Sequence, residues 1–200
     1  MARGGTDAHA ALVDLPPLVA CAVAAAKGVG FGLSCLPSQG RLLRVLAGGV
    51  GDGRIGETGT GAGVGLAWLA SGAAPGARLV SVERDAGLAR VAGAVFEDQP
   101  AVEVLEGDWQ DLQRHGPFDL LVLDGGGQGK GEEPPLRPEL WLRPGGLVVL
   151  DDFTPSTGWP PLFDGRPDAA RLHWLEHPRL SATQVRTQPD AATILAVLKH

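Results

Sequence analysis

Residues 57–65 read Glu57-Thr58-Gly59-Thr60-Gly61-Ala62-Gly63-Val64-Gly65. This run lies between a short apolar segment, Arg54–Thr58, and a helical pattern, Val64–Ala70, so it joins a strand to a helix. Glycines at such a junction permit a sharp turn and let a ligand approach the backbone. The run therefore predicts a ligand-binding turn in an α/β fold.

The spacing of the glycines separates the kinds of ligand that such a turn can hold. A dinucleotide turn reads G-x-G-x-x-G, but the last glycine is replaced by Val64 or by Leu66 in the two registers that begin at Gly59 and Gly61. A phosphate-binding loop would need Gly-Lys-Ser or Gly-Lys-Thr, and neither follows. Glu57 instead precedes three alternating glycines, a spacing that matches neither kind of site. A glycine-rich turn without a ligand is the alternative.

The rest of the chain alternates between short apolar runs and helical patterns, as expected for βαβ units and a parallel sheet. After Arg54–Thr58, strands are expected at Arg78–Val82, Val102–Leu105, Phe118–Leu123 and Leu147–Leu150. Helices are expected at Val64–Ala70, Ala86–Phe96, Gln110–Arg114, Leu136–Leu142 and Pro167–Glu176, and two last strands at Ala182–Arg186 and Thr193–Leu198. We therefore predict an α/β fold with a doubly wound, mainly parallel, seven-stranded Rossmann-like sheet that ends in an antiparallel hairpin.

The chain is expected to form one domain, because 200 residues with 44% hydrophobic side chains suit a single core. Two further helices, Leu15–Lys27 and Pro37–Ala47, precede the first strand. The expected order is a disordered tail (1–12) followed by the domain (13–200). Within the domain we expect N-terminal helices (13–50), a cofactor-binding core (51–152), and a lid loop, helix and final hairpin (153–200).

The composition excludes several classes of partner. The net charge is −6 and lysines and arginines form no cluster, so neither nucleic acid nor a membrane surface is expected as a partner. Two cysteines form no disulfide framework and suggest a reducing compartment. The sequence has no apolar run of ~18 residues and no signal-peptide layout at its start, so we expect a cytoplasmic location. Its 30 glycines reflect either genomic bias or loops that approach a ligand.

Acidic residues follow the next two strands at positions that suit a nucleoside. Glu83 ends the second strand, where a carboxylate can accept both ribose hydroxyls, and Asp108 and Trp109 follow the third. With the turn at 57–65 and the sequence Arg143-Pro144-Gly145-Gly146 before the fifth strand, these features resemble the class I S-adenosylmethionine-dependent methyltransferases. The resemblance implies S-adenosylmethionine as cofactor, with Asp108 at the adenine amine and Trp109 against its ring; a core Trp is the alternative. The implied cofactor-binding residues are Glu57, Gly59, Thr60, Gly61, Gly63, Glu83, Asp108, Trp109 and Asp124.

Three aspartates follow two adjacent strands: Asp124 the fourth, and Asp151 and Asp152 the fifth. Their carboxylates should meet at the ligand-binding edge of the sheet and repel each other unless a cation or proton lies between them. Oxygen ligands suit Mg²⁺, Mn²⁺ or Ca²⁺. The pattern resembles the cation-dependent catechol and caffeoyl-coenzyme A O-methyltransferase branch, as does Ser34-x-x-Pro37-x-x-Gly40-x-Leu42-Leu43. The resemblance implies that the three aspartates hold a metal, which would orient the acceptor and promote ionisation of its hydroxyl.

The segment after the fourth strand departs from that branch. It reads Asp124-Gly125-Gly126-Gly127-Gln128-Gly129-Lys130-Gly131, where bulky or charged residues are usual. Lys130 is a candidate general base if burial lowers its pKa, and a solvated lysine is the alternative. Asp124 is the second candidate catalytic residue. The apolar segment 153–164 is interpreted as a wall or lid of the acceptor pocket, as a loop over the sheet edge, or as a dimer contact.

The sequence thus predicts an S-adenosylmethionine-dependent methyltransferase that acts on a hydroxyl of a small-molecule acceptor, with a divalent cation. The resemblance also implies a homodimer, because members of the resembled branch are often dimers. Three alternatives stay open: a metal-independent N- or O-methyltransferase, a nicotinamide oxidoreductase that the glycine spacing disfavours, and a non-catalytic S-adenosylmethionine-binding protein.

Overall fold

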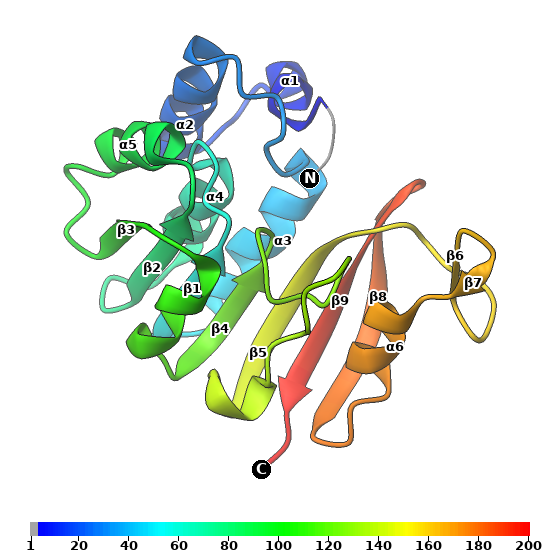
Figure 1. Ribbon diagram of the computed structural model, residues 1–200. Coiled ribbons are helices and arrows are strands. Elements are labelled where there is room, and N and C mark those ends of the chain that lie inside the picture. The colour runs from blue at the N-terminus through cyan, green and yellow to red at the C-terminus, as the bar shows by residue number, and fades with distance from the viewer. Residues whose placement is uncertain (1–3) are drawn as a thin grey trace.

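In the computed structural model, which describes residues 4–200, a seven-stranded sheet forms the centre of the molecule (Figure 1). The strands lie in the order β3-β2-β1-β4-β5-β9-β8; β1 to β5 are parallel, and β9 and β8 pair antiparallel at one edge. Their bounds are β1 Arg54–Thr58, β2 Arg78–Glu83, β3 Val102–Glu106, β4 Phe118–Leu123, β5 Leu142–Phe153, β8 Leu180–Gln188 and β9 Ala191–Leu198. This topology confirms the predicted doubly wound sheet with its antiparallel hairpin.

Each face of the sheet packs against its own layer. In β4, Leu120 and Val122 contribute to one core and Leu121 and Leu123 to the other, as the two-residue period of a strand requires. The first core also contains side chains of α2 (Pro17–Gly28), α3 (Pro37–Gly48) and α4 (Val64–Gly72), and α5 (Ala86–Val95) packs beside them. The second contains side chains of η2 (Trp109–His115) and α6 (Ala169–Leu175), with η3 (Pro138–Leu140) nearby. Both faces are covered, which explains why the inner strands β4 and β9 are mostly apolar.

The strand order reverses between β1 and β4, which pair through Ile55 with Leu120 and Thr58 with Leu123. In open α/β sheets, ligands bind outside the carboxyl ends of the strands at such a switch point. Here those ends carry the glycine turn that follows Thr58 and the aspartate that follows Leu123. The topology therefore brings together the glycine turn and Asp124, which the sequence identified as candidate ligand-binding residues.

The prediction of a disordered tail over residues 1–12 is wrong for its described part. Residues 5–11 form a short helix, α1 (Gly5–Ala8), and the 3₁₀ turn η1 (His9–Ala11); residues 1–3 lie outside the described residues. Thr6 and His9 are buried, and they hydrogen-bond to residues far along the chain: the Thr6 hydroxyl donates to the carbonyl of Phe31 (2.7 Å) and Trp68 Nε1 donates to His9 Nε2 (3.1 Å). Composition cannot reveal such distant partners.

The helix predicted over Leu136–Leu142 is also wrong. Only the 3₁₀ turn η3 forms there, because Leu142 already pairs with Phe118 and begins β5, which is longer than the predicted Leu147–Leu150. The apolar segment after β5 ends with β6 (Leu162–Phe163), which pairs with β7 (Arg166–Pro167) in a small hairpin that the sequence did not predict. Within the described chain, no helix is both long and apolar enough to cross a membrane.

Candidate active site

The glycine turn after β1 adopts a conformation that only glycine tolerates well. Gly59, Gly61 and Gly63 have φ angles of +83°, +54° and +92°, and Gly63 leads into α4. A Cβ atom on Gly59 would lie 2.5 Å from Cα of Gly125, in the segment that follows β4. The turn thus has the sharp bend that its sequence predicted, and it lets the backbone of residue 125 approach closely.

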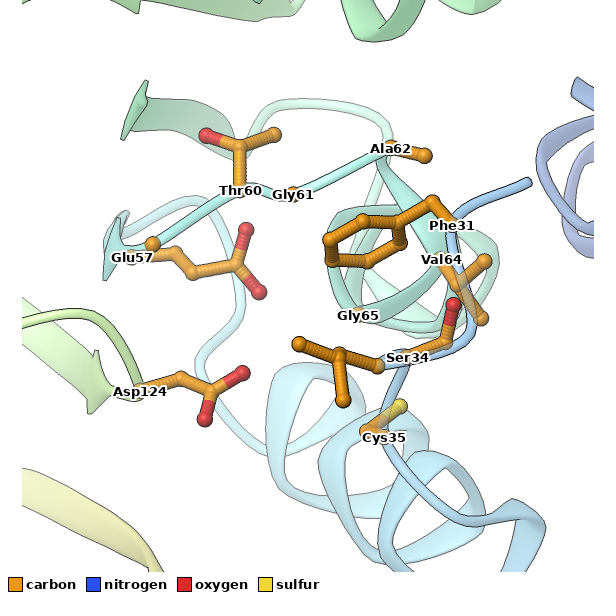
Figure 2. Close-up of a pocket in the computed structure, with 12 residues that line it drawn as sticks. Phe31, Ser34, Cys35, Glu57, Thr60, Gly61, Ala62, Val64, Gly65 and Asp124 are labelled. Atoms are coloured by element: carbon orange, nitrogen blue, oxygen red, sulfur yellow. The ribbon is translucent and has the colours of Figure 1, made fainter. Parts of the chain in front are cut away.

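A cavity lies at this turn, and two carboxylates face it (Figure 2). Figure 2 shows the side chains of Glu57, at the end of β1, and Asp124, after β4, pointing into the cavity, with the ring of Phe31 opposite. Ser34 and Cys35, which precede α3, also line it. The cavity has a volume of about 10 Å³ and lies between the two central strands and the segment 31–35, which we call the strap.

The electrostatics of this cavity favour a cation. Burial raises the pKa of Glu57 to about 8, although the Ser81 hydroxyl donates to its Oε2 at 2.7 Å. Burial and the charge of Asp151 also raise the pKa of Asp124, and the Asp124 Oδ1 atom is buried without a hydrogen-bond partner among the described residues. A positively charged group would stabilise both carboxylates, since opposite charge favours the ionised form. The amino-acid end of S-adenosylmethionine carries such a group.

A second hollow adjoins the first at Gly59 and suits a nucleoside. Its lining includes Glu83 at the end of β2, and Asp108 and Trp109 after β3. Glu83 accepts hydrogen bonds from the backbone nitrogens of Gly61 (2.8 Å) and Asp85 (2.9 Å), which fix its carboxylate beside the turn. Asp108 caps η2 by accepting from the backbone nitrogen of Gln110 (3.0 Å). The structure thus brings the predicted ribose and adenine residues to one hollow.

Trp109 belongs both to this hollow and to the core. Its ring stacks on Trp141 with 5.7 Å between centroids, and its Nε1 donates to Oε1 of Glu133 (3.2 Å). Glu133 also lines the hollow. Glu133 has no signal in the sequence, because it is one of two adjacent glutamates in a segment without periodicity. Only the path of the chain brings it to Trp109.

The glycine-rich segment 125–131, which we call the glycine loop, packs tightly against the glycine turn and against Trp109. A Cβ atom on Gly125 would lie 2.3 Å from Cα of Gly59, and one on Gly126 would lie 2.4 Å from Cδ1 of Trp109. On Gly127 it would lie 3.2 Å from Cζ3 of Trp109. The glycines therefore let the loop pass between the turn and the Trp109 ring, where a larger residue would displace one of them.

The three aspartates converge as predicted. One carboxylate oxygen from each of Asp124, Asp151 and Asp152 lies within 4.8 Å of the other two, and within residues 4–200 this is the one such group of metal-ligating side chains. Asp152 has a φ of +63°, which is unusual for a residue with a Cβ atom. The unpartnered Oδ1 of Asp124 and the three converging carboxylates fit a hard divalent cation, which takes oxygen ligands.

Lys130 lies beside this group, on the glycine loop. Its Nζ donates to the backbone carbonyls of Asp151 (2.6 Å) and Asp152 (2.8 Å) and lies 4.1 Å from the centroid of the Phe153 ring. Burial lowers its pKa to about 8, against the charges of Asp151 and Asp124, which raise it. Lys130 is therefore part of the site and not a solvated lysine on a loop.

Two larger cavities flank the chain after β5. The first has a volume of about 480 Å³ and includes Leu36, Gln39, Asp151 and Phe153 in its lining, together with the β8–β9 turn. Gln39 is buried, and its Oε1 has no hydrogen-bond partner in the described chain. The second has a volume of about 790 Å³ and lies against the β6–β7 hairpin. The segment 153–164 thus contributes to the walls of both.

Comparisons with known proteins find methyltransferases among the relatives of this chain. A family model described as a methyltransferase domain matches residues 57–153, from the glycine turn to the residue after the last aspartate. The catechol O-methyltransferase of Mycobacterium tuberculosis (strain ATCC 25618 / H37Rv) is 31% identical over 191 residues, which cover 88% of this chain and 84% of that protein.

Solved structures share the fold. Cofactor-bound Rv0187 from MTB is 27% identical, with a TM-score of 0.74 over 100% of this chain and 99% of that one. An O-methyltransferase from Bacillus cereus in complex with SAH is 22% identical, with a TM-score of 0.71 over 98% and 96% of the two chains. The similarity to both covers the sheet, the N-terminal helices and the final hairpin together.

Proposed function

Since the chain belongs to the class I S-adenosylmethionine-dependent O-methyltransferases, we propose that it methylates a hydroxyl group of a small acceptor molecule with the help of a divalent cation. One observation carries the proposal. Asp124 lines the cofactor cavity and is also one of the three converging aspartates, so the methyl donor and the acceptor would meet at this residue.

Residues of the two adjoining hollows would each contact a different part of the cofactor. Bound S-adenosylmethionine supplies the methyl group. Glu83 would accept the ribose hydroxyls, Asp108 would accept from the adenine amine, and Trp109 would line the adenine ring. Glu57 and Asp124 would place negative charge around the cationic end of the molecule.

The aspartates would supply the cation site. Asp124, Asp151 and Asp152 would hold the cation through three carboxylate oxygen ligands. A bound cation would supply the positive charge that stabilises the ionised form of the acceptor hydroxyl.

The cavity of about 480 Å³ supports a small-molecule acceptor, because ligand pockets of this kind have volumes of ~300–1,000 Å³. Leu36 and Phe153 give it apolar walls, and Asp151 and Asp152 lie on its lining. The relative from Mycobacterium tuberculosis is named for catechol, so acceptors with two adjacent hydroxyls are the first to test.

The experiment measures methyl transfer from S-adenosylmethionine to a panel of catechols and related phenols, with Mg²⁺ or after treatment with a chelator. We expect turnover that requires the cation. Asp151→Asn should abolish it while binding of S-adenosylhomocysteine, measured by titration calorimetry, stays within a few-fold. Asp98→Asn, at an exposed residue away from the site, is the matched control. Equal turnover by Asp151→Asn would contradict the metal proposal.

One observation favours a second candidate, a metal-independent N- or O-methyltransferase. The ammonium group of Lys130 lies 2.6 and 2.8 Å from the carbonyls of Asp151 and Asp152, so a positive charge is already next to the carboxylates. In that case the aspartates would contact an acceptor directly. Turnover that survives complete removal of divalent cations would favour this candidate.

A further inference from the structure

We propose that Lys130 is a positioning residue that holds the backbone of Asp151 and Asp152 in the conformation in which their carboxylates face Asp124. This inference rests on the proposed cation-dependent function. It assigns Lys130 to the support of the aspartates, whereas the sequence made it a candidate base.

Asp151 and Asp152 lie where β5 departs from regular pairing. The register between β5 and β9 pairs Leu150 with Ile194 and then Phe153 with Ala192, so it shifts across the two aspartates. Irregularities of this kind re-aim side chains next to active sites. Asp152 has a φ of +63°, a conformation that a non-glycine residue keeps only when its surroundings hold it.

Lys130 supplies that support from the opposite loop. Its Nζ donates to both carbonyls of the irregular pair, at 2.6 Å for Asp151 and 2.8 Å for Asp152. Gln128, two residues earlier, directs its Nε2 to the carbonyl of Asp151 at 3.4 Å and also donates to that of Leu123 at the end of β4. The glycine loop therefore ties the ends of β4 and β5 together, on the side of the aspartates.

Lys130 itself is held in place. Its Nζ lies 4.1 Å from the centroid of the Phe153 ring, the residue that follows the pair. Gly129 and Gly131, on either side, have φ angles of +79° and +74°, which bend the loop so that the lysine turns back to β5. Trp174 Nε1 donates to the Gln128 carbonyl at 2.8 Å and anchors the loop to α6. The ammonium group of Lys130 is therefore held in a position from which it donates to both backbone carbonyls.

The test measures Mn²⁺ binding by paramagnetic resonance, with manganese chloride alone, in the full chain. Lys130→Met keeps an apolar stem but loses the donors; we expect its Mn²⁺ affinity to fall ~10- to 100-fold, as for other groups that orient metal ligands. Lys130→Arg keeps donors and should stay within about threefold of wild type. Lys199→Met is the matched control, because Lys199 also donates to a backbone carbonyl, that of Pro178 (3.0 Å), far from the site along the chain.

Binding of S-adenosylhomocysteine separates this inference from the proposed function. Unchanged affinity in all variants shows that the cofactor site is intact. A Lys130→Met variant that binds Mn²⁺ as tightly as wild type, or more tightly, overturns the inference. So does a Lys130→Arg variant that binds Mn²⁺ normally but has lost turnover, since that result identifies a base.

A crystal structure of Lys130→Met measures the backbone conformation of Asp152 without any metal. We expect Asp152 to leave the left-handed region; an unchanged φ there overturns the inference. If wild type binds no Mn²⁺, the proposed cation fails, and the Asp152 conformation still decides whether Lys130 positions the pair.

Discussion

Glu57 links cofactor binding to protonation. Because burial raises its pKa to about 8, much of it is protonated near neutral pH, whereas a cationic ligand favours its ionised form. Binding of S-adenosylmethionine should therefore release protons, and its affinity should rise from about pH 6 to about pH 7. Calorimetry in buffers of different ionisation enthalpy measures the number of protons released.

Glu57→Gln provides the control for this prediction. The amide can still accept from the Ser81 hydroxyl but cannot titrate, so it should bind the cofactor more weakly and with a flatter pH dependence. If the variant and the wild type release the same number of protons, Glu57 is not the linked group. Asp124, whose pKa is also raised, would then be the next residue to substitute.

Residues at the ends of strands were predictable from the sequence, and residues on the loops between them were not. Glu57, Glu83 and Asp124 each follow an apolar run, and a parallel sheet sends the ends of such runs to one edge. Glu133 and Gln128 reach the site only through the path of the glycine loop, which has no repeating pattern. Their positions follow from contacts with Trp109 and the strand ends, and local sequence does not encode those contacts.

At the scale of elements, the glycine loop depends on close approach to Trp109. A Cβ atom on Gly126 would lie 2.4 Å from the Trp109 ring, where the ring cannot stay in place. Gly126→Ala should therefore weaken binding of S-adenosylhomocysteine by about tenfold or more, because it moves the wall of the adenine hollow, and reduce tryptophan-fluorescence changes on binding.

Gly131→Ala is the matched variant for this loop. Gly131 also has a positive φ, +74°, but a Cβ atom there meets nothing within 4 Å. It should lose ~1 kcal/mol of stability through backbone strain and keep its cofactor affinity. Equal affinity losses in the two variants would show that loop conformation matters and contact with Trp109 does not.

Helix α1 depends on a neutral histidine. Trp68 Nε1 donates to His9 Nε2 (3.1 Å), and His9 Nδ1 lies 2.9 Å from the carbonyl of Gly5, so the neutral ring satisfies both partners. Burial lowers the pKa of His9 below its ordinary value of 6.5. The unfolded chain therefore binds the proton more readily, and this contribution to stability is present above about pH 6.5 and is lost as the pH falls toward the folded pKa.

His9→Gln tests this prediction. The variant should lose ~1–2 kcal/mol of unfolding free energy at pH 7.5 but show a smaller further loss at pH 5.5 than wild type does, measured by urea denaturation. His200→Gln, at the exposed C-terminal residue, should behave as wild type. A parallel decline of His9→Gln and wild type would show that His9 does not control the pH dependence.

The same helix shows where sequence reading of elements fails. Long periodic segments such as α3 and strands such as β1 were predicted within a residue or two, since their own side chains carry the signal. α1 has only four residues, and Thr6 within it and His9 at its C-cap are stabilised by contacts with Phe31 and Trp68. It fixes the strap that closes the cofactor cavity, so an element without a sequence signal contributes to the site.

At the scale of the whole molecule, the topology decides the site. The strand reversal between β1 and β4 brings the glycine turn and the glycine loop together, and the β4–β5 pairing brings Asp124 beside the two aspartates. The sequence predicted this convergence because strand order follows from the regular alternation of elements. It could not predict the irregular pairing of β5, since that depends on the register with β9, a strand about forty residues away.

Binding of the cofactor should raise the unfolding temperature of the whole molecule. A ligand that binds only the folded chain stabilises it by ~2.7 kcal/mol at one hundred times its dissociation constant. For a domain of this size, each kcal/mol raises the unfolding midpoint by ~2–4 °C, so S-adenosylhomocysteine should raise it by ~5–10 °C. NAD at equal concentration should leave it unchanged, because the turn lacks the third glycine of a dinucleotide site and two carboxylates in the adjoining cavity would repel a pyrophosphate. Differential scanning calorimetry measures both shifts, and an increase with NAD that matches the increase with S-adenosylhomocysteine would contradict the assignment of the turn.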